Sequence, residues 1–288
     1  MKLTSDELTI TIVLFEEEKS LVFECLDNIK DFKIIIIDNA NDFLLRSKIE
    51  EKYKIYKYIL NKENQGVSKA FNQAIKLCDT SYILNINADC FIKSESIIKL
   101  LESHKKYKNC FLTSPTFYDK KSNLTYNAGS FLESKNSNKV LSLNGDICVD
   151  MVLGSAILYK KEDIIKLGMF DENFFVYFLD YDLCQKIKKI KMSVIQVFDA
   201  KAIHSHGQSK VKNFFKRAYN RYYNFTYDEL YYHYNKKDHY KKFNNLEKKI
   251  NNYIFKSILN LLILRLEKSI EYFATIRAYL SFKKFISK

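Results

Sequence analysis

Short apolar runs alternate with amphipathic segments along the first hundred residues of the chain. The runs of strand length are 8–15, 33–37 and 56–60. The segments with apolar residues at helical spacing are 16–28, 44–53 and 67–78. Strands that alternate with helices predict parallel β-α-β units, which cross over in a right-handed sense. We therefore expect the first half of the chain to form a Rossmann-like half-domain.

A fourth apolar run, within residues 81–90, ends in a carboxylate. Tyr82-Ile83-Leu84 leads into Asn85-Ile86-Asn87-Ala88-Asp89. Ligands of open α/β sheets bind just beyond the carboxyl ends of the strands, so Asp89 is placed to hold a cation, and the cation to hold phosphate oxygens. Taken alone, Asp89 more often would be a helix N-cap, because residues 94–102 have a helical pattern.

The second half has a different pattern: residues 149–153 lead through Gly154-Ser155-Ala156 to a strand predicted at 157–159. A short helix is predicted at 161–167, ended by Gly168, and a further strand at 194–198. Four carboxylates then lie among sixteen mainly aromatic residues: Asp171, Glu172, Asp180 and Asp182. Asp180 and Asp182 could simply open a helix whose apolar face continues to Ile187. Alternatively, an aromatic pocket could raise the pKa of a carboxylate that acts as a general base.

Composition narrows the class of protein. The chain has 288 residues, 47% of them hydrophobic, with six Gly and one Pro, so it can bury a large core and is not of low complexity. The six cysteines form no C-x-x-C pair, which favours free thiols in a reducing cytoplasm. Neither a secretory signal nor a membrane-spanning apolar stretch is expected. The sequence also lacks G-x-G-x-x-G and G-x-x-x-x-G-K-[ST], which disfavours a nicotinamide enzyme or a P-loop kinase.

The net charge of +13 belongs almost wholly to the last part of the chain. Residues 210–288 carry 18 Lys and Arg against 6 Asp and Glu, a net of +12, and are crowded with Tyr and Phe in a helical pattern. This composition suits an anionic membrane surface, but it equally suits helices that pack on the catalytic domain and expose a solvated basic face. Nucleic acid is a weaker third partner, because no recognition motif accompanies the charge.

The ordered set of motifs over residues 8–209 resembles glycosyltransferase family 2, and within it the bacterial rhamnosyltransferase-like members. The matching pieces are Asp38-Asn39, Asn64-x-Gly66 with Asn72, Asn87-Ala88-Asp89, Gly154, Gly168-Met169-Phe170-Asp171-Glu172 with Phe174-Phe175, Asp180-x-Asp182-Leu183-Cys184, and His204 five residues before Ser209. One departure is Leu179, which stands where the family commonly has Glu before its catalytic Asp.

The resemblance implies a GT-A fold, an α/β architecture with a mixed, mainly parallel sheet flanked by helices, here with a C-terminal helical extension. It implies a glycosyltransferase domain over 1–209, with a nucleotide-sugar half to about 105 and an acceptor half at 106–209, followed by the helical tail 210–288.

The resemblance also implies roles for individual residues. The nucleotide-binding candidates are Asp38, Gly66, Asn72 and Asn87. Asp89 and His204 would hold Mg²⁺ or Mn²⁺ against the diphosphate, and Asp180 would be the catalytic base. The acceptor-side candidates are Asp171, Glu172 and Asp182. Several of these residues have plainer alternatives: an Asx turn at Asp38, a loop at Gly66, a structural histidine at His204, a helix start at Asp182, and stabilisation of an acceptor loop by Asp171 and Glu172.

The implied activity is metal-dependent, inverting transfer of a sugar from a UDP- or dTDP-sugar, dTDP-rhamnose among them, to a surface glycan or lipid-linked acceptor. The basic tail would bring the enzyme to the inner face of the membrane, as a peripheral protein of polysaccharide and cell-envelope synthesis. Leu179 leaves open a non-catalytic scaffold that binds a nucleotide sugar or a membrane surface. A sugar nucleotidyltransferase is disfavoured, because no glycine-rich phosphate signature lies near the N-terminus.

Overall fold

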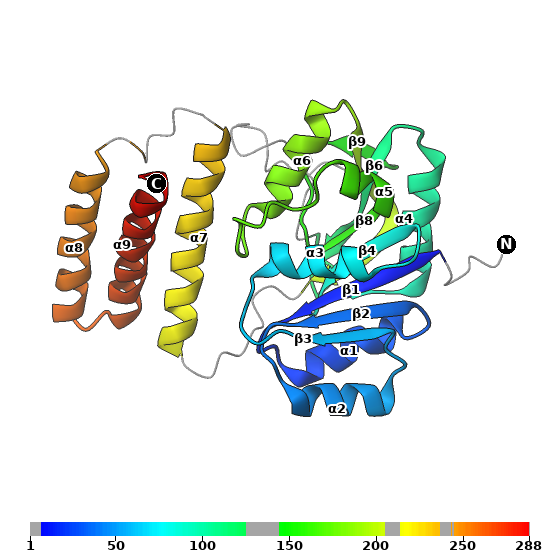
Figure 1. Ribbon diagram of the computed structural model, residues 1–288, viewed down its shortest axis with the longest axis horizontal. Coiled ribbons are helices and arrows are strands. Elements are labelled where there is room, and N and C mark those ends of the chain that lie inside the picture. The colour runs from blue at the N-terminus through cyan, green and yellow to red at the C-terminus, as the bar shows by residue number, and fades with distance from the viewer. Residues whose placement is uncertain (1–6, 125–143, 205–213, 237–242, 244, 288) are drawn as a thin grey trace. The chain divides into compact units, whose positions relative to one another are not determined.

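The computed structural model describes residues 7–124, 144–204, 214–236, 243 and 245–287 (Figure 1). The chain divides into two compact units. The first comprises Met1–Asp171 and Leu179–Lys210, and the second comprises Glu172–Phe178 and Val211–Lys288. The segment Glu172–Phe178 therefore belongs with the tail, although the sequence suggested a boundary at residue 209.

The first unit is an α/β domain built on one mixed sheet. Its strands are β1 (Leu8–Leu14), β2 (Lys33–Asp38), β3 (Lys57–Leu60), β4 (Tyr82–Asn87), β5 (Cys90–Ile92), β6 (Cys110–Tyr118), β7 (Ile147–Val149), β8 (Ala156–Lys160) and β9 (Ser193–His204). Its helices are α1 (Lys19–Ile29), α2 (Phe43–Lys52), α3 (Val67–Leu77), α4 (Ser94–Lys106), α5 (Lys161–Lys166) and α6 (Leu179–Lys189).

The sheet has the order β3-β2-β1-β4-β8-β6-β9-β5, and β7 pairs with β9. The first four strands in this order are parallel, as the alternating pattern predicts, and β6 is parallel to β9. Strand β8 runs antiparallel between β4 and β6, and β5 runs antiparallel to β9. The mixed, mainly parallel α/β sheet flanked by helices is confirmed.

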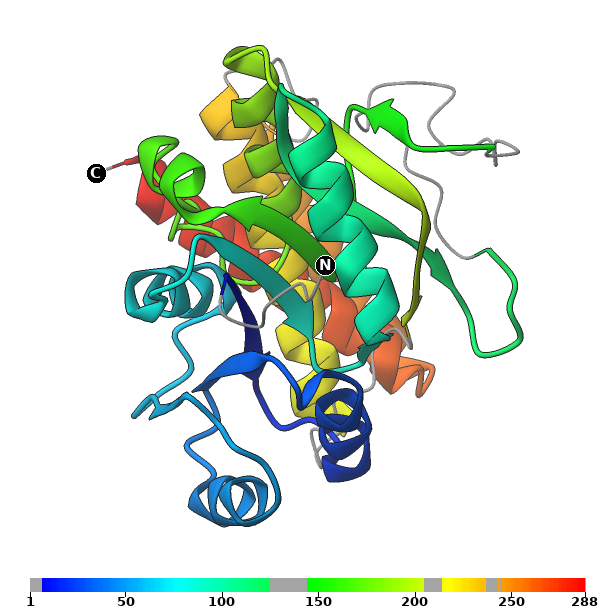
Figure 2. The ribbon, with the colours of Figure 1, turned by 90° about the vertical axis from the view of Figure 1, so that its right-hand side faces the viewer.

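The two faces of the sheet follow from the alternation of side chains along each strand. Leu8, Ile10, Ile12 and Leu14 of β1 lie in one core cluster with the apolar faces of α1, α2 and α4. Helix α3 contacts β1 and β2 but contributes no side chain to that cluster, so it covers the opposite face. Figure 2 shows α4 lying along the strands of the second half of the sheet, where it packs against β6, β8 and β9.

Several element boundaries differ from the sequence expectations. The short strand β5 follows Asp89 and pairs with the end of β9, which extends to His204 instead of ending near residue 198. Lys93, not Asp89, is the N-cap of α4, so the N-cap alternative for Asp89 is wrong. Gly168 has φ +92° directly after α5, in the C′ position predicted for it.

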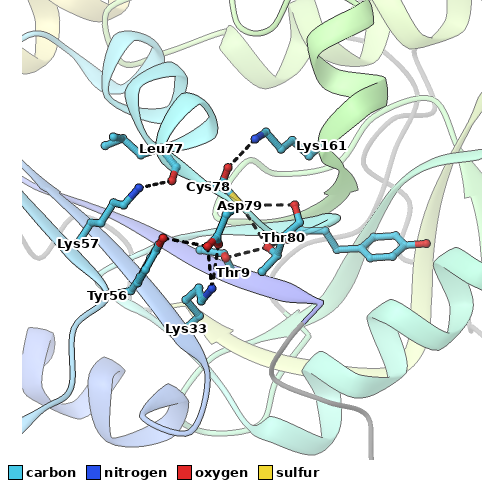
Figure 3. Close-up of polar contacts among 10 residues, drawn as sticks. Thr9, Lys33, Tyr56, Lys57, Leu77, Cys78, Asp79, Thr80 and Lys161 are labelled. Atoms are coloured by element: carbon cyan, nitrogen blue, oxygen red, sulfur yellow. Dashed lines mark hydrogen bonds and ion pairs between the residues drawn. The ribbon is translucent and has the colours of Figure 1, made fainter.

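The C-terminal end of α3 is anchored by lysine side chains, which fixes the start of β4. Lys57 donates to the carbonyl of Leu77 at 2.7 Å, and Lys161 donates to the carbonyl of Cys78 (Figure 3). Lysines stabilise the otherwise unpaired carbonyls of a helix C-terminus. Asp79, next in the chain, accepts from Lys33 and from the Tyr56 hydroxyl (Figure 3). The strand that leads to Asp89 therefore starts from a rigid connection.

In its described residues, the second unit has three long helices: α7 (Phe214–Lys236), α8 (Leu246–Leu262) and α9 (Leu266–Ile286). Helix α9 contacts both α7 and α8 (Figure 1). The helical tail is thus confirmed. Among the helices in the described part of the chain, none combines the length and the apolar character that a bilayer crossing requires. Ser209 and, within the tail, residues 210–213, 237–242, 244 and 288 lie outside the described ranges.

Candidate active site

Asp89 and His204 meet at the turn that connects β4 to β5. Asp89 lies in this tight turn, and the next residue, Cys90, pairs with His204 at the end of β9. The Nε2 atom of His204 lies 3.3 Å from Oδ1 of Asp89. His204 is 8% exposed and Asp89 is half-buried. The fold therefore brings together the two residues that the sequence suggested as metal ligands.

Ser155 connects this pair to the neighbouring strand. Its hydroxyl lies 3.3 Å from Nδ1 of His204, and the Asn87 side-chain amide donates to it at 3.5 Å. The Asn87 backbone N–H also donates to the Ser155 carbonyl at 2.9 Å. Because Ser155 engages Nδ1, it orients the imidazole so that Nε2 faces Asp89. Sequence reasoning noted only the adjacent Gly154 and missed Ser155.

Asp180 lies beside Gly154, the residue that precedes Ser155. The Gly154 N–H donates to Oδ2 of Asp180 at 3.0 Å, and the Tyr181 N–H donates to Oδ1 at 3.0 Å. Burial raises the pKa of Asp180, and these backbone donors partly offset that rise. The direction of the pKa shift is the one expected of a general base, and the two bonds fix the carboxylate in one orientation.

Gly154 has little room for a side chain. A Cβ atom at this position would lie 3.3 Å from Cβ of Asp180 and 3.5 Å from its Oδ2. The close approach of the backbone to Asp180 thus depends on glycine. Gly154 thus contacts the base candidate Asp180, and the next residue, Ser155, contacts the metal-ligand candidate His204.

The Asp38 carboxylate is fully buried and bonded to its own surroundings. It accepts from the N–H groups of Ala40 at 2.7 Å and Asp42 at 3.3 Å, and from the Tyr58 hydroxyl at 3.1 Å. Burial raises its pKa, and these bonds oppose the rise. This is the geometry of the turn alternative noted from the sequence. Its neighbour Asn39 reaches the Gly66 carbonyl at 3.1 Å and so ties the end of β2 to the loop before α3.

Gly66 and Asn72 lie at and within α3. Gly66 is the N-cap and has φ 80°, a left-handed conformation that favours glycine. Asn72 is 2% exposed, donates to the Phe170 carbonyl at 2.9 Å and accepts from the Phe170 N–H at 3.1 Å. Asn72 therefore clamps the backbone directly before Asp171, a contact that its residue type alone did not reveal.

Glu17 is a further carboxylate near the site that the sequence interpretation did not single out. It follows β1 and accepts from the Phe15 N–H. Its pKa is raised from 4.5 to about 7, chiefly by burial and to a lesser degree by the charges of Asp89 and Asp38, while backbone N–H bonds oppose the rise. The sequence read residues 16–28 as one helix, but Glu16 has φ 58° and α1 starts at Lys19. The run of three acids where the first strand ends was the available signal.

The acceptor-side candidates divide between the two units. Asp171 and Asp182 belong to the first unit, where burial, and to a smaller degree the charge of Asp171, raises the pKa of Asp182. Asp182 is buried in the first turn of α6 and pairs with Lys186 at 2.7 Å, as a helix-start residue would. Glu172 is exposed and opens the segment Glu172–Phe178 of the second unit.

Asp228 of α7 organises that segment. Its carboxylate is fully buried and accepts from the N–H groups of Phe175, Val176 and Tyr177 at 3.0, 2.9 and 2.8 Å. Burial raises its pKa to about 6 against these bonds. Sequence reasoning missed Asp228, because an acid within a basic, aromatic helix carries no local signal of a partner fifty residues earlier.

The chemistry of Asp89 and His204 fits a divalent cation. One carboxylate and one imidazole, with water and the two phosphates of a nucleotide completing the shell, is a donor set that suits Mn²⁺ or Mg²⁺. Within the described residues no group of three or more His, Cys, Asp or Glu gathers as a metal cage.

The fold is shared with solved glycosyltransferases. GalNAc-T7 in complex with UDP, GalNAc and Mn²⁺ matches with a TM-score of 0.58 and 13% identity, over 76% of this chain and 50% of that one. The mannosyltransferase PcManGT from Pyrobaculum calidifontis, in complex with GDP-Man and Mn²⁺, matches with a TM-score of 0.54 and 14% identity, over 76% and 62%. These similarities support the GT-A fold expected from the sequence.

Two characterised relatives are similar in sequence. Rhamnosyltransferase WbbL of Escherichia coli K12 is 24% identical over 231 residues, which cover 72% of this chain and 87% of the relative. dTDP-rhamnosyl transferase RfbF of Shigella flexneri is 24% identical over 184 residues, which cover 62% of each chain. The family described as Glycosyl transferase family 2 matches residues 9–168, more than half of the chain. Because this match spans more than half of the chain, the chain belongs to glycosyltransferase family 2.

Proposed function

We propose that this inverting glycosyltransferase uses a divalent cation and Asp180 on two sides of one bound donor. The observation that carries the proposal is the Gly154-Ser155 dipeptide. Gly154 donates to Asp180, and Ser155 contacts His204, which in turn faces Asp89. Inverting transfer needs a base near the acceptor and charge neutralisation at the leaving diphosphate, and this dipeptide links the candidates for both.

The residues have distinct tasks in this proposal. Asp180 accepts the proton of the acceptor hydroxyl, and its raised pKa makes it a stronger base than an exposed aspartate. Gly154 and Tyr181 hold its carboxylate by backbone N–H bonds. Asp89 and His204 hold the cation, which when bound would neutralise charge on the departing nucleoside diphosphate. Ser155 keeps the imidazole oriented toward it.

The donor in this proposal is a dTDP- or UDP-sugar, and the two rhamnosyltransferase relatives favour dTDP-rhamnose. The acceptor is a hydroxyl of a growing surface glycan or of a lipid-linked glycan. We propose a peripheral position at the inner face of the membrane, which the charge of the tail supports: 18 Lys and Arg against 6 Asp and Glu over residues 210–288.

A thermal-shift measurement tests the donor site. UDP, GDP, dTDP and the corresponding sugars are added with and without Mn²⁺ to the wild-type protein and to Asp89→Ala. A ligand that binds the native state stabilises it by about 2.7 kcal/mol at one hundred times its Kd. For a chain of this size, that stabilisation raises the melting temperature by several degrees.

The expected result is a Mn²⁺-dependent shift with dTDP- or UDP-type ligands that Asp89→Ala loses. Lys48→Ala, an exposed change on α2 of the first unit, is the control and should keep the shift in melting temperature. The absence of any shift with all of these nucleotides, in a wild-type protein with a cooperative melting transition, would contradict the proposed donor site.

A further inference from the structure

The hairpin of α8 and α9 exposes an unusual number of large apolar side chains around its turn. We call this set the hairpin tip; it comprises Phe255, Ile258, Leu259, Leu261, Leu262, Ile263, Leu264 and Leu266. The most exposed are Leu262 at 74% and Leu264 at 82%. Within α8, the spacing of Phe255, Ile258 or Leu259, and Leu262 puts them on one helical face. Contiguous apolar surface of this kind marks an interaction site.

The tip is not needed to hold the hairpin together. The two helices are joined by mutual hydrogen bonds between Ser257 and Ser269, at 3.0 and 2.9 Å from each hydroxyl to the opposite carbonyl. Tyr253 packs on the rings of Tyr272 and Tyr279, with centroids 5.9 and 5.8 Å apart. The side chains of the tip lie apart from these contacts and remain at least two-fifths exposed.

Leu264 gives independent support, because its backbone would favour another residue. It has φ 58° directly after the end of α8, and the Leu264 and Arg265 N–H groups donate to the carbonyls of Leu261 and Asn260. This is the hydrogen-bond pattern in which glycine usually occupies the left-handed position. The chain instead places a highly exposed leucine there, at a cost in backbone strain.

The charge around the tip limits its partner. Lys256 and Arg265 lie within the tip segment, Lys268 follows it, and the described residues 246–287 hold eight Lys and Arg against three Asp and Glu. A second copy of the chain would bring the same positive charges together and be repelled. An anionic bilayer offers apolar interior to the leucines and negative headgroups to the cations.

We propose that the hairpin tip inserts its apolar side chains into the surface of a bilayer that contains anionic phospholipid. Lys256, Arg265 and Lys268 remain at the level of the headgroups, as long cationic side chains do at such interfaces. Tyr253 and Tyr272, whose rings lie 5.9 and 5.7 Å from the Lys256 ammonium, have the amphipathic character favoured at the same level. This inference rests on the proposed function in one respect, the position at the membrane. It goes further by naming the residues that would make the membrane contact.

Vesicle flotation tests the tip. The full chain is mixed with vesicles of phosphatidylcholine alone or with added phosphatidylglycerol, and the bound fraction is compared for wild type, Leu262→Asp with Leu264→Asp, and Leu264→Gly. Leu44→Asp is the matched control, because Leu44 is 73% exposed on α2, in the first unit. Wild type and Leu44→Asp should bind vesicles with phosphatidylglycerol, and the paired aspartates should weaken binding about 10-fold or more.

Leu264→Gly separates binding from folding. Glycine suits the left-handed position, so its melting temperature should equal or exceed that of wild type while its binding to vesicles weakens. Tip variants that bind as well as wild type, or a wild-type chain that binds neither vesicle, would overturn the proposal. So would a wild-type dimer in sedimentation that the tip variants dissociate without any effect on flotation. The nucleotide-dependent thermal shift is recorded on the same variants, so a failure of the tip and a failure of the donor site are distinguishable.

Discussion

The close approach of the Gly154 backbone to Asp180 makes a prediction about catalysis. Gly154→Ala would put a Cβ atom 3.3 Å from Cβ of Asp180, and the carboxylate would have to shift. Because small misplacements of a base are costly, we expect turnover to fall about 10-fold or more with little change in the affinity for donor. Gly145→Ala is the control, since a Cβ there meets no atom within 4 Å. Equal turnover in the two variants would refute the positioning role of Gly154.

Glu17 predicts a pH dependence of stability. Its pKa is raised from 4.5 to about 7 in the folded chain, so the stabilisation linked to its proton is complete below 4.5 and is lost as the pH rises through about 7. Glu17→Gln keeps an acceptor for the Phe15 N–H but does not titrate. Relative to wild type, it should gain up to about 3 kcal/mol in unfolding free energy between pH 4 and pH 9.

Urea unfolding at both pH values measures this difference. Glu24→Gln, on the exposed side of α1, is the control. It measures the effect on stability of replacing an exposed carboxylate by an amide. A Glu17→Gln variant whose stability parallels that of wild type across the range would show that Glu17 is not buried as described.

At the scale of residues, the sequence could not predict which groups most side chains would contact. The residues Asp89, His204 and Asp180 were found from motif order, and the structure brings Asp89 to His204 and Asp180 to Gly154. Their roles remain predictions. The Asx-turn alternative for Asp38 anticipates its bond to the Ala40 N–H, but Asn72 carries no sequence sign that its side chain bonds to the Phe170 backbone. Such partners depend on the packing of distant segments, which residue type does not encode.

At the scale of elements, strands and helices with a regular apolar pattern were predictable. A short strand that forms only by pairing with a distant segment was not. Strands β1 and β2 and helix α3 follow from apolar periodicity within a residue or two. Strand β5 has three residues and exists because it pairs with the end of β9, so local pattern could not reveal it. The same pairing extends β9 to His204 and thereby completes the contact with Asp89.

The bond of Asp228 to the segment Glu172–Phe178 makes a prediction about a whole element. Asp228→Ala would leave three backbone N–H groups without their acceptor, at about 1–3 kcal/mol for each that stays buried. We expect the amides of Phe175, Val176 and Tyr177 to lose protection against hydrogen exchange. Because this segment runs directly into Leu179 and Asp180, turnover should also fall.

Glu229→Ala, the next residue of α7, is the matched control and should leave the exchange of those amides unchanged. If the three amides of Asp228→Ala exchanged as slowly as in wild type, the carboxylate would not be what holds the segment.

At the scale of the whole molecule, charge separates the two parts of the chain. Residues 1–209 carry 29 Lys and Arg against 28 Asp and Glu, while the tail has a net charge of +12. Family membership, which the match over residues 9–168 establishes, accounts for the fold of the first part. It gives no information about the tail. The sequence left membrane binding and packing of the tail as equal alternatives, because composition alone does not say which apolar residues stay exposed. The exposed tip is the observation that favours the membrane.

The central claim is that Asp180 is the base of a donor-dependent transfer. The most direct test measures two quantities on Asp180→Asn: release of nucleoside diphosphate from a dTDP- or UDP-sugar with Mn²⁺, water serving as acceptor, and affinity for the same nucleotide. Loss of a general base slows turnover about 10²- to 10⁴-fold, so release should fall by at least the lower figure while affinity stays within about 2-fold. Release at the wild-type rate would contradict the account.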